Sequence, residues 1–198
     1  MGSDPAPFFA NLFLFFYEAK WMKELKKKDY TKALKYGNIN RFIDDLIAIN
    51  DCKEFMNTFL QIYPQELKLN KENDSDQHAT FLDMDITIEG RKLKTKLYDK
   101  RNSYNFDIVR FPYKNSNLPS KMFYATIGAE VLRICRATSE YTDSISTTSP
   151  FLARMRSQGA FEGAIKRALR KMISRHWESF AKYDIPDTDI IHDVIATT

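Results

Sequence analysis

Residues 39–50 read Ile-Asn-Arg-Phe-Ile-Asp-Asp-Leu-Ile-Ala-Ile-Asn and place two adjacent carboxylates, Asp44 and Asp45, between two short apolar runs. Two such runs around a polar pair predict a β-hairpin with the carboxylates at its tip. Neighbouring carboxylates repel each other, and a divalent cation relieves that repulsion. Because Mg²⁺ binds through one or two carboxylates together with substrate phosphates, the tip is a candidate metal site. The alternative is simple turn chemistry, since Asp is common in turns.

The segment before this hairpin is strongly apolar. A helix is expected over residues 7–28, apolar on nearly all sides at first, amphipathic later, and ending in three lysines that suit a helix C-terminus. We expect its apolar half to be buried. The apolar run is too short to span a bilayer and lacks the basic flank and cleavage site of a signal peptide. No other segment is a membrane candidate, so no membrane partner is expected.

The segments after the hairpin alternate between helix and strand patterns. A short helix is expected over residues 52–63, ended by Pro64, followed by a strand at 66–70 and a polar loop at 71–78. Alternation of apolar and polar residues over 80–88 and 93–98 predicts a second hairpin, with its turn at 89–91 and a lysine-rich second strand. Asp83 and Asp85 are expected to face solvent on its outer side.

The remainder of the chain shows helical patterns only. Helices are expected over residues 119–138, 150–158 and 160–181, with a polar linker at 139–149 and a frayed acidic tail after Tyr183. This order of elements predicts an α+β fold, in which an antiparallel sheet precedes a helical subdomain.

The charge distribution is more informative than the net charge of +4. Residues 150–183 hold eight basic and two acidic residues, whereas the tail after them is acidic. Such asymmetry indicates an element that faces a polyanion. The two cysteines, Cys52 and Cys135, have no metal-binding spacing, which favours a reduced, intracellular protein.

Two motifs, in matching order and spacing, resemble those of reverse transcriptases. Met1-Gly2-Ser3-Asp4-Pro5 and the apolar helix after it resemble the loop and helix that lie under the nascent base pair. Arg41-Phe42-Ile43-Asp44-Asp45 resembles the aromatic-x-Asp-Asp hairpin, with Phe42 where many members have Tyr. Residues 81–85, 95–101, 106–112 and 117–120 are similar to the reverse transcriptases of Penelope-like retroelements. The resemblance covers roughly residues 1–180.

The resemblance implies a fold and a reaction. The fold would be a partial polymerase palm with a primer-grip-like hairpin (residues 1–100), a connection and all-helical thumb (101–183), and a poorly ordered acidic tail (184–198). The parent enzyme would be an RNA-directed DNA polymerase that transfers nucleotides to a primer 3′-hydroxyl with two Mg²⁺ (or Mn²⁺) ions. Its partners would be an RNA template, a DNA primer and deoxynucleoside triphosphates. Such an enzyme is compatible with the nucleus as its location.

The same resemblance assigns roles to individual residues. Asp44 would be the direct catalytic metal ligand and Asp45 its supporting neighbour. The residues near the templating base or incoming nucleotide would be Gly2, Ser3, Pro5 and Phe42. For the loop, helix entry is an alternative or additional role, with Ser3 or Asp4 as N-cap and Pro5 in the first turn.

Two groups of basic residues are candidates for nucleic-acid contacts. The primer backbone would lie against Lys94, Lys96 and Lys100, and the duplex phosphates against Lys166, Arg167, Arg170 and Lys171. Solvated charged faces are the alternative reading for both groups.

In the family a further metal-binding Asp and the fingers precede the Gly-Ser loop, where this chain begins. The chain is therefore expected to be a fragment that is inactive alone. One alternative is a non-catalytic nucleic-acid-binding remnant of a retroelement. Another is a decayed product whose first helix lacks its partner strand and exposes an apolar patch.

Overall fold

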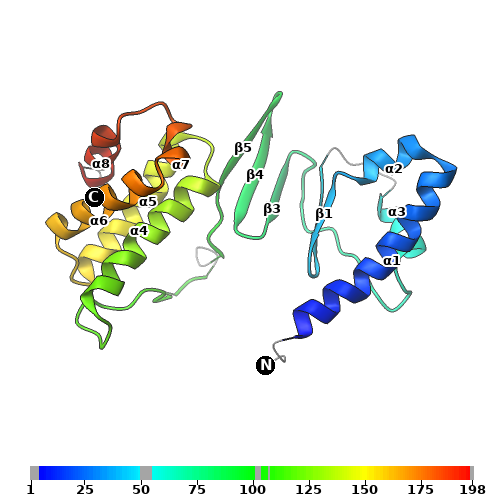
Figure 1. The fold of residues 1–198 in the computed structure, drawn as a ribbon, viewed down its shortest axis with the longest axis horizontal. Coiled ribbons are helices and arrows are strands. Elements are labelled where there is room, and N and C mark those ends of the chain that lie inside the picture. Colours follow the sequence, from blue (N-terminus) through cyan, green and yellow to red (C-terminus); the bar gives the residue numbers. More distant parts are fainter. Residues whose placement is uncertain (1–4, 50–54, 101–103, 107, 197–198) are drawn as a thin grey trace. The chain divides into compact units, whose positions relative to one another are not determined.

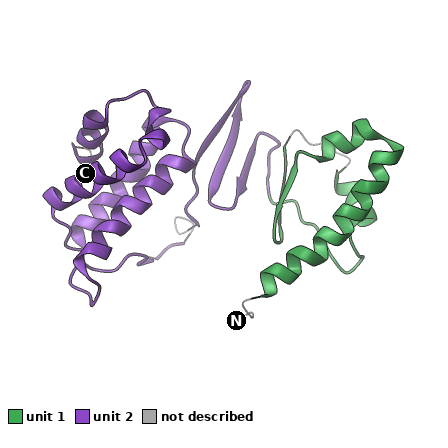
Figure 2. Cartoon of the chain, in the orientation of Figure 1, with its two compact units in different colours: residues 1–72 green, residues 73–198 purple. Residues whose placement is uncertain are grey.

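The computed structural model describes residues 5–49, 55–100, 104–106 and 108–196 (Figure 1). Within them the chain is mixed helix and sheet, with eight α-helices and two small antiparallel sheets, which confirms the α+β class. It divides into two compact units, Met1–Glu72 and Asn73–Thr198 (Figure 2). In the described part of the chain, no helix combines the length and the apolar character that a bilayer-spanning segment needs.

The first unit surrounds a small aromatic core. Its elements are α1 (Ala6–Lys28), α2 (Tyr30–Tyr36), β1 (Ile39–Phe42), β2 (Asp45–Ala48) and α3 (Phe55–Ile62). The core consists of Tyr36, Phe55, Phe59, Ile62 and Tyr63. The short helix α2 was not expected from the sequence. It forms because the extended backbone of Asp29 ends α1 and its carboxylate caps the next helix, accepting from the Lys32 N–H at 2.9 Å.

The prediction that the apolar half of α1 is buried is wrong. The helix has nearly the expected bounds, but none of its residues is buried. The later turns of α1 pack on the core through Tyr17, Trp21 and Leu25 among others. Most apolar side chains of its first turns are not covered by the rest of the unit. The large apolar side chains left exposed there are Phe8, Phe9, Leu12, Phe13, Phe15 and Phe16.

Replacing both Phe9 and Phe16 with glutamate is expected to reduce self-association of the chain, because exposed contiguous apolar surface drives aggregation. The two rings are 61% and 64% exposed, so the free energy of unfolding should change by no more than about 0.5 kcal/mol per substitution. Light scattering against concentration and thermal unfolding would measure the two effects. As a control, Trp21→Glu should lower stability, because the Trp21 ring packs on Tyr36 at 4.8 Å. Unchanged self-association of the double variant would contradict this expectation.

The second unit begins with a three-stranded sheet that differs from the predicted pattern. Its strands are β3 (His78–Phe81), β4 (Met84–Glu89) and β5 (Lys92–Leu97), in the order β3-β4-β5. The hairpin of β4 and β5 was expected, but the single strand predicted at 80–88 is interrupted at Leu82, whose φ is 56°. The strand predicted at 66–70 is absent from the structure, and Leu67 and Leu69 instead pack on the core of the first unit.

This sheet joins the helical part of the chain rather than the first unit, which differs from the predicted division near residue 100. The Ser139 N–H donates to the Thr95 carbonyl at 2.8 Å, and the Ser139 hydroxyl accepts from the Thr95 N–H at 3.0 Å. Leu97 also packs with Ile134 of the following helix.

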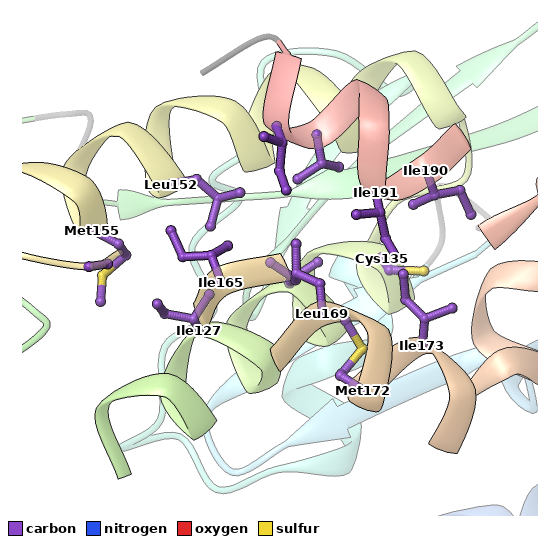
Figure 3. Packing of buried hydrophobic residues seen from close by; sticks show 14 of the residues in the cluster. Ile127, Cys135, Leu152, Met155, Ile165, Leu169, Met172, Ile173, Ile190 and Ile191 are labelled. Atoms are coloured by element: carbon purple, nitrogen blue, oxygen red, sulfur yellow. The ribbon is translucent and has the colours of Figure 1, made fainter. Parts of the chain in front are cut away.

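Five helices build the main core of the second unit (Figure 3). They are α4 (Ser120–Ala137), α5 (Tyr141–Ser157), α6 (Glu162–Arg175), α7 (Trp177–Ala181) and α8 (Asp187–Ala196). The apolar spine predicted for α4 is confirmed, because Phe123, Ile127, Val131, Ile134 and Cys135 are all buried.

The predicted polar linker at 139–149 is wrong, because α5 is continuous from Tyr141 to Ser157 and contains Pro150. Ser144 and Thr148 are buried inside this helix, so packing has outweighed their low helix propensity. Hydroxyl groups of this helix donate to backbone carbonyls three or four residues earlier, and Ser149 Oγ donates to the Ile145 carbonyl at 2.9 Å.

The single helix predicted at 160–181 is divided at His176, which separates α6 from α7. Trp177, predicted to lie on the apolar stripe, is 59% exposed. The change of direction brings Lys182 and Tyr183 to the C-terminal end of α4. There the Lys182 ammonium donates to the Cys135 and Thr138 carbonyls, at 2.6 Å each, and satisfies helix-end acceptors.

The acidic tail predicted to be poorly ordered at 184–198 instead contains α8. Its residues Ile190, Ile191, Val194 and Ile195 are buried in the main core, and Figure 3 shows Ile190 and Ile191 beside side chains of the other helices. The Tyr141 hydroxyl donates to Asp193 Oδ2 at 2.8 Å and lowers the pKa of that carboxyl.

Cys135 is fully buried, and this burial raises the pKa of its thiol. Its Sγ donates to the Ser179 carbonyl at 3.1 Å. Because the thiolate is the reactive form, Cys135 is expected to resist iodoacetamide at pH 8 in the folded chain and to react fully once the chain is unfolded in urea. Peptide mass spectrometry would measure the labelling. Rapid labelling of Cys135 in the folded chain would contradict the packing described for α4.

Candidate functional site

The predicted hairpin with two carboxylates is present. Strands β1 and β2 are antiparallel, with Phe42 opposite Asp45, so Ile43 and Asp44 form a two-residue turn. The Asp44 and Asp45 side chains are exposed. The hairpin therefore presents its two carboxylates to solvent at the tip.

The turn has an uncommon backbone conformation. Ile43 has a φ of 55°, in the left-handed region that glycine and asparagine usually occupy. A β-branched residue held there costs about 1–3 kcal/mol, and such strain persists only where surrounding contacts hold it. The residue next to Asp44 is thus kept in a conformation that its own side chain disfavours.

Arg41 is the side chain that ties this turn to α1. Its guanidinium makes five hydrogen bonds, one for each of its N–H groups. Nη1 donates to the Ile43 carbonyl at 3.0 Å and to Asn11 Oδ1 at 2.7 Å. Nε and Nη2 donate to the two carboxylate oxygens of Glu18 at 2.5 and 3.2 Å, and Nη2 also donates to the Asn11 carbonyl at 3.4 Å.

Glu18 extends the network to the segment that follows α3. The Tyr63 hydroxyl donates to Glu18 Oε1 at 2.6 Å. Burial, together with this hydrogen bond, raises the pKa of Tyr63, while the hydrogen bond that Arg41 donates to Glu18 raises the pKa of Arg41. The neutral phenol and the charged guanidinium are therefore both stabilised, and the network connects α1, β1 and the segment that follows α3.

This network was not predicted from the sequence. Arg41 lies beside the carboxylate pair, but its partners Asn11 and Glu18 are 30 and 23 residues away. Arg41 and Glu18 are separated by a helix boundary and by α2, which the sequence did not predict.

The carboxylates fit a divalent cation in chemistry, but by themselves they would supply only part of the ligands that a two-metal centre needs. Oxygen donors from one or two Asp side chains, completed by water and phosphate oxygens, are what Mg²⁺ binds. Over the residues that the structure describes, however, no group of three or more Asp, Glu, His or Cys side chains lies together. Asp44 and Asp45 would hold the ion, and a complete pair of ions would need a further carboxylate.

The residues assigned to the nucleotide are only partly described. Gly2 and Ser3 lie outside the described residues, as does Asp4. Pro5 is exposed and is itself the N-cap of α1, with its carbonyl accepting from the Phe9 N–H at 3.0 Å, rather than part of the first turn. Phe42 is 53% exposed beside the turn.

The lysines predicted to contact a primer differ in their surroundings. Lys94 lies 3.5 Å from Asp143 and 3.8 Å from Glu89, which raise its pKa. Lys96 lies 3.4 Å from Asp85, while Lys100 is exposed.

The expectation that Asp85 faces solvent is wrong. Its side chain is 14% exposed and is paired with both Lys96 and His78, one from each neighbouring strand. Asp83 is 54% exposed but is also ion-paired, at 2.8 Å from Arg133.

The basic face predicted on the last long helix is exposed on α6. Arg167, Arg170 and Lys171 all point into solvent. Lys166 is instead half-buried and lies 2.6 Å from Glu162, one helical turn earlier. Three of the four predicted cations are therefore exposed on one helix, which belongs to a different unit from the hairpin.

Comparison of the chain with protein-family models, with curated proteins and with solved structures returned no match.

Proposed function

We propose that this chain is part of an RNA-directed DNA polymerase of the reverse transcriptase kind, in which the hairpin of β1 and β2 supplies metal-binding carboxylates. The observation that carries the proposal is the exposed Asp44-Asp45 pair at a two-residue turn. The resemblance of residues 41–45 to the aromatic-x-Asp-Asp motif supports it. The partners would be an RNA template, a DNA primer and deoxynucleoside triphosphates.

The residues of the hairpin would have distinct tasks in this enzyme. Asp44 and Asp45 would bind Mg²⁺ or Mn²⁺, and the bound ions would activate the primer 3′-hydroxyl and neutralise phosphate charge. Phe42, exposed beside the turn, would contact the nucleotide or template. The network of Arg41 and Glu18 would keep the turn on α1.

The test is primer extension on an RNA template with Mg²⁺. It would compare the 198-residue chain alone with the same chain joined to an upstream segment that supplies a further metal-binding Asp and triphosphate-binding fingers. Because no third acidic, His or Cys side chain lies with Asp44 among the described residues, we expect extension only by the joined chain. Extension by the short chain alone would mean that another carboxylate completes the site. No extension by either would overturn the proposal.

A second candidate function, nucleic-acid binding without catalysis, is favoured by the exposed basic face of α6. Neutralising Arg167, Arg170 and Lys171 with glutamine is expected to weaken binding of an RNA–DNA duplex. Each phosphate contact that is lost should reduce the slope of log K against log salt by about 0.9. Fluorescence anisotropy at several salt concentrations would measure this.

The matched control replaces three exposed lysines of α1, Lys23, Lys26 and Lys27, with glutamine, which removes the same charge from the other unit. Equal loss of affinity in both triple variants would show that only net charge matters. Binding that depends on α6 but is unchanged by Asp44→Asn, in a chain without extension activity, would favour the non-catalytic function.

A further inference from the structure

We infer that Arg41 is a positioning residue, which holds the peptide between Ile43 and Asp44 in its left-handed turn and so fixes the direction in which Asp44 meets a divalent cation. The inference rests on the proposed function, because it concerns the same site. It assigns the role to the side chain beside the carboxylates rather than to the turn sequence itself.

Arg41 contacts the turn directly. Arg41 Nη1 donates to the Ile43 carbonyl at 3.0 Å. That carbonyl belongs to the peptide group that also contains the Asp44 N–H. Because a peptide group is planar, its orientation sets the direction in which the backbone enters Asp44.

The guanidinium of Arg41 is itself held in a fixed position. Glu18 binds Nε and Nη2 in a bidentate pair, and Asn11, two helical turns earlier on α1, binds Nη1 and Nη2. The Arg41 side chain is only 12% exposed. A planar guanidinium anchored on two sides offers its remaining donor in one direction, which a lysine ammonium does not reproduce.

The two-residue turn contains no glycine, which would make such support unnecessary. Glycine adopts positive φ without steric cost, whereas the turn has Ile43 at 55°. The register of Phe42 opposite Asp45 leaves only two residues to reverse the chain. A contact from outside the turn is therefore needed, and Arg41 makes it.

Two parts of the Arg41 network can be separated. The Glu18 pair anchors the hairpin to α1, which is a structural role. The hydrogen bond from Nη1 reaches the exposed tip, beyond the core of the first unit, and Asn11 orients the same nitrogen. A substitution of Asn11 therefore leaves the Glu18 anchor in place and disturbs the positioning contact.

The experiment is NMR spectroscopy of the 198-residue chain with two readouts. The intraresidue nuclear Overhauser effect between the Ile43 amide and Hα protons is strong only at positive φ. Mn²⁺ titration then measures line broadening of the Asp44 and Asp45 amides. We expect Arg41→Lys to weaken the Ile43 effect and to raise the Mn²⁺ concentration for half-broadening about 10- to 100-fold, the usual loss when a partner of a metal ligand is removed.

A second substitution tests the mechanism by rescue. Adding Ile43→Gly to Arg41→Lys should restore part of the broadening at low Mn²⁺, because glycine adopts the positive φ of the turn without steric cost. If Arg41→Lys unfolds the first unit, Asn11→Ala provides the test, with the same direction of change expected in both readouts. An unchanged Ile43 effect and unchanged Mn²⁺ response in the folded variant would overturn the inference.

The outcomes also separate this inference from the proposed function. If the unmodified chain shows no Mn²⁺ broadening at the tip, the metal role fails, and the Ile43 effect still reports whether Arg41 holds the turn. If the unmodified chain binds Mn²⁺ at the tip and the variants bind equally well, the metal role stands and the positioning role of Arg41 is wrong.

Discussion

Replacing Asp44 with asparagine in the joined chain is expected to lower primer extension by about 100- to 1000-fold, an effect of the size seen when a group that stabilises transition-state charge is lost. Asparagine keeps the shape of the side chain but removes the negative charge that binds the cation. Because the Asp44 side chain is exposed at the turn, the fold should be unchanged. Single-turnover extension with Mg²⁺ would measure the loss, and thermal unfolding would check the fold.

Two controls accompany this prediction. Glu66→Gln removes one carboxylate charge from an exposed position in the same unit and should leave extension unchanged. Asp45→Asn should have a smaller effect than Asp44→Asn, since the resemblance makes Asp45 the supporting neighbour. Full activity of Asp44→Asn would exclude the hairpin from the metal site.

Replacing Glu130 with alanine is expected to destabilise the second unit by about 2–3 kcal/mol, somewhat below the usual cost of breaking a buried pair because its partners are partly exposed. The Glu130 side chain is 8% exposed, and it accepts from Arg110 at 3.2 Å and from Arg133 at 2.8 Å. Arg133 in turn binds Asp83 in the turn between β3 and β4. Loss of Glu130 leaves a half-buried guanidinium without its main partner and loosens the sheet on α4.

Urea unfolding followed by circular dichroism would measure this change. Glu178→Ala is the matched control, since Glu178 is exposed on α7 and should cost little. Arg110→Ala should cost less than Glu130→Ala, because the Arg110 side chain is 40% exposed and leaves Glu130 paired with Arg133. Equal stability of Glu130→Ala and the unmodified chain would contradict the packing described around α4.

The elements predicted correctly are those whose signal is local. The hairpin at 39–50 depends on two apolar runs around a polar pair, and the spine of α4 follows from 3.6-residue spacing. Both elements are present in the structure because neighbouring elements pack against their apolar residues. The apolar half of α1 had an equally clear pattern, but its burial depended on covering elements that the described residues do not provide.

The errors come from features that depend on contacts distant in sequence. Leu82 carries none of the usual turn signals, yet it reverses the chain at positive φ, so alternation alone could not locate the break. The Ser/Thr-rich start of α5 is helical because its face is buried against other helices. In α8 the apolar pairs at 190–191 and 194–195 did carry a helical pattern, which the acidic residues around them obscured.

The candidate site divides in the same way. Asp44 and Asp45 are adjacent, so their chemistry is visible in the sequence. The Arg41 partners Asn11 and Glu18 lie on α1, which the unpredicted helix α2 separates from β1 in the sequence. The network that holds the turn can therefore be seen only in the structure. The ion pairs of Lys94 and Lys96 likewise depend on neighbours that lie far away in sequence or on another strand, whereas the pair of Lys166 with Glu162 follows the four-residue spacing of a helix.

The most direct test of the central claim is Fe²⁺-directed cleavage of the 198-residue chain. Fe²⁺ in place of Mg²⁺, with ascorbate and peroxide, produces hydroxyl radicals that cut the backbone beside the bound ion, and mass spectrometry locates the cuts. We predict cuts within residues 42–46 that excess Mg²⁺ suppresses and that Asp44→Asn abolishes. Cuts concentrated elsewhere, or cuts at the hairpin that persist in Asp44→Asn, would contradict the assignment of the tip as a metal site.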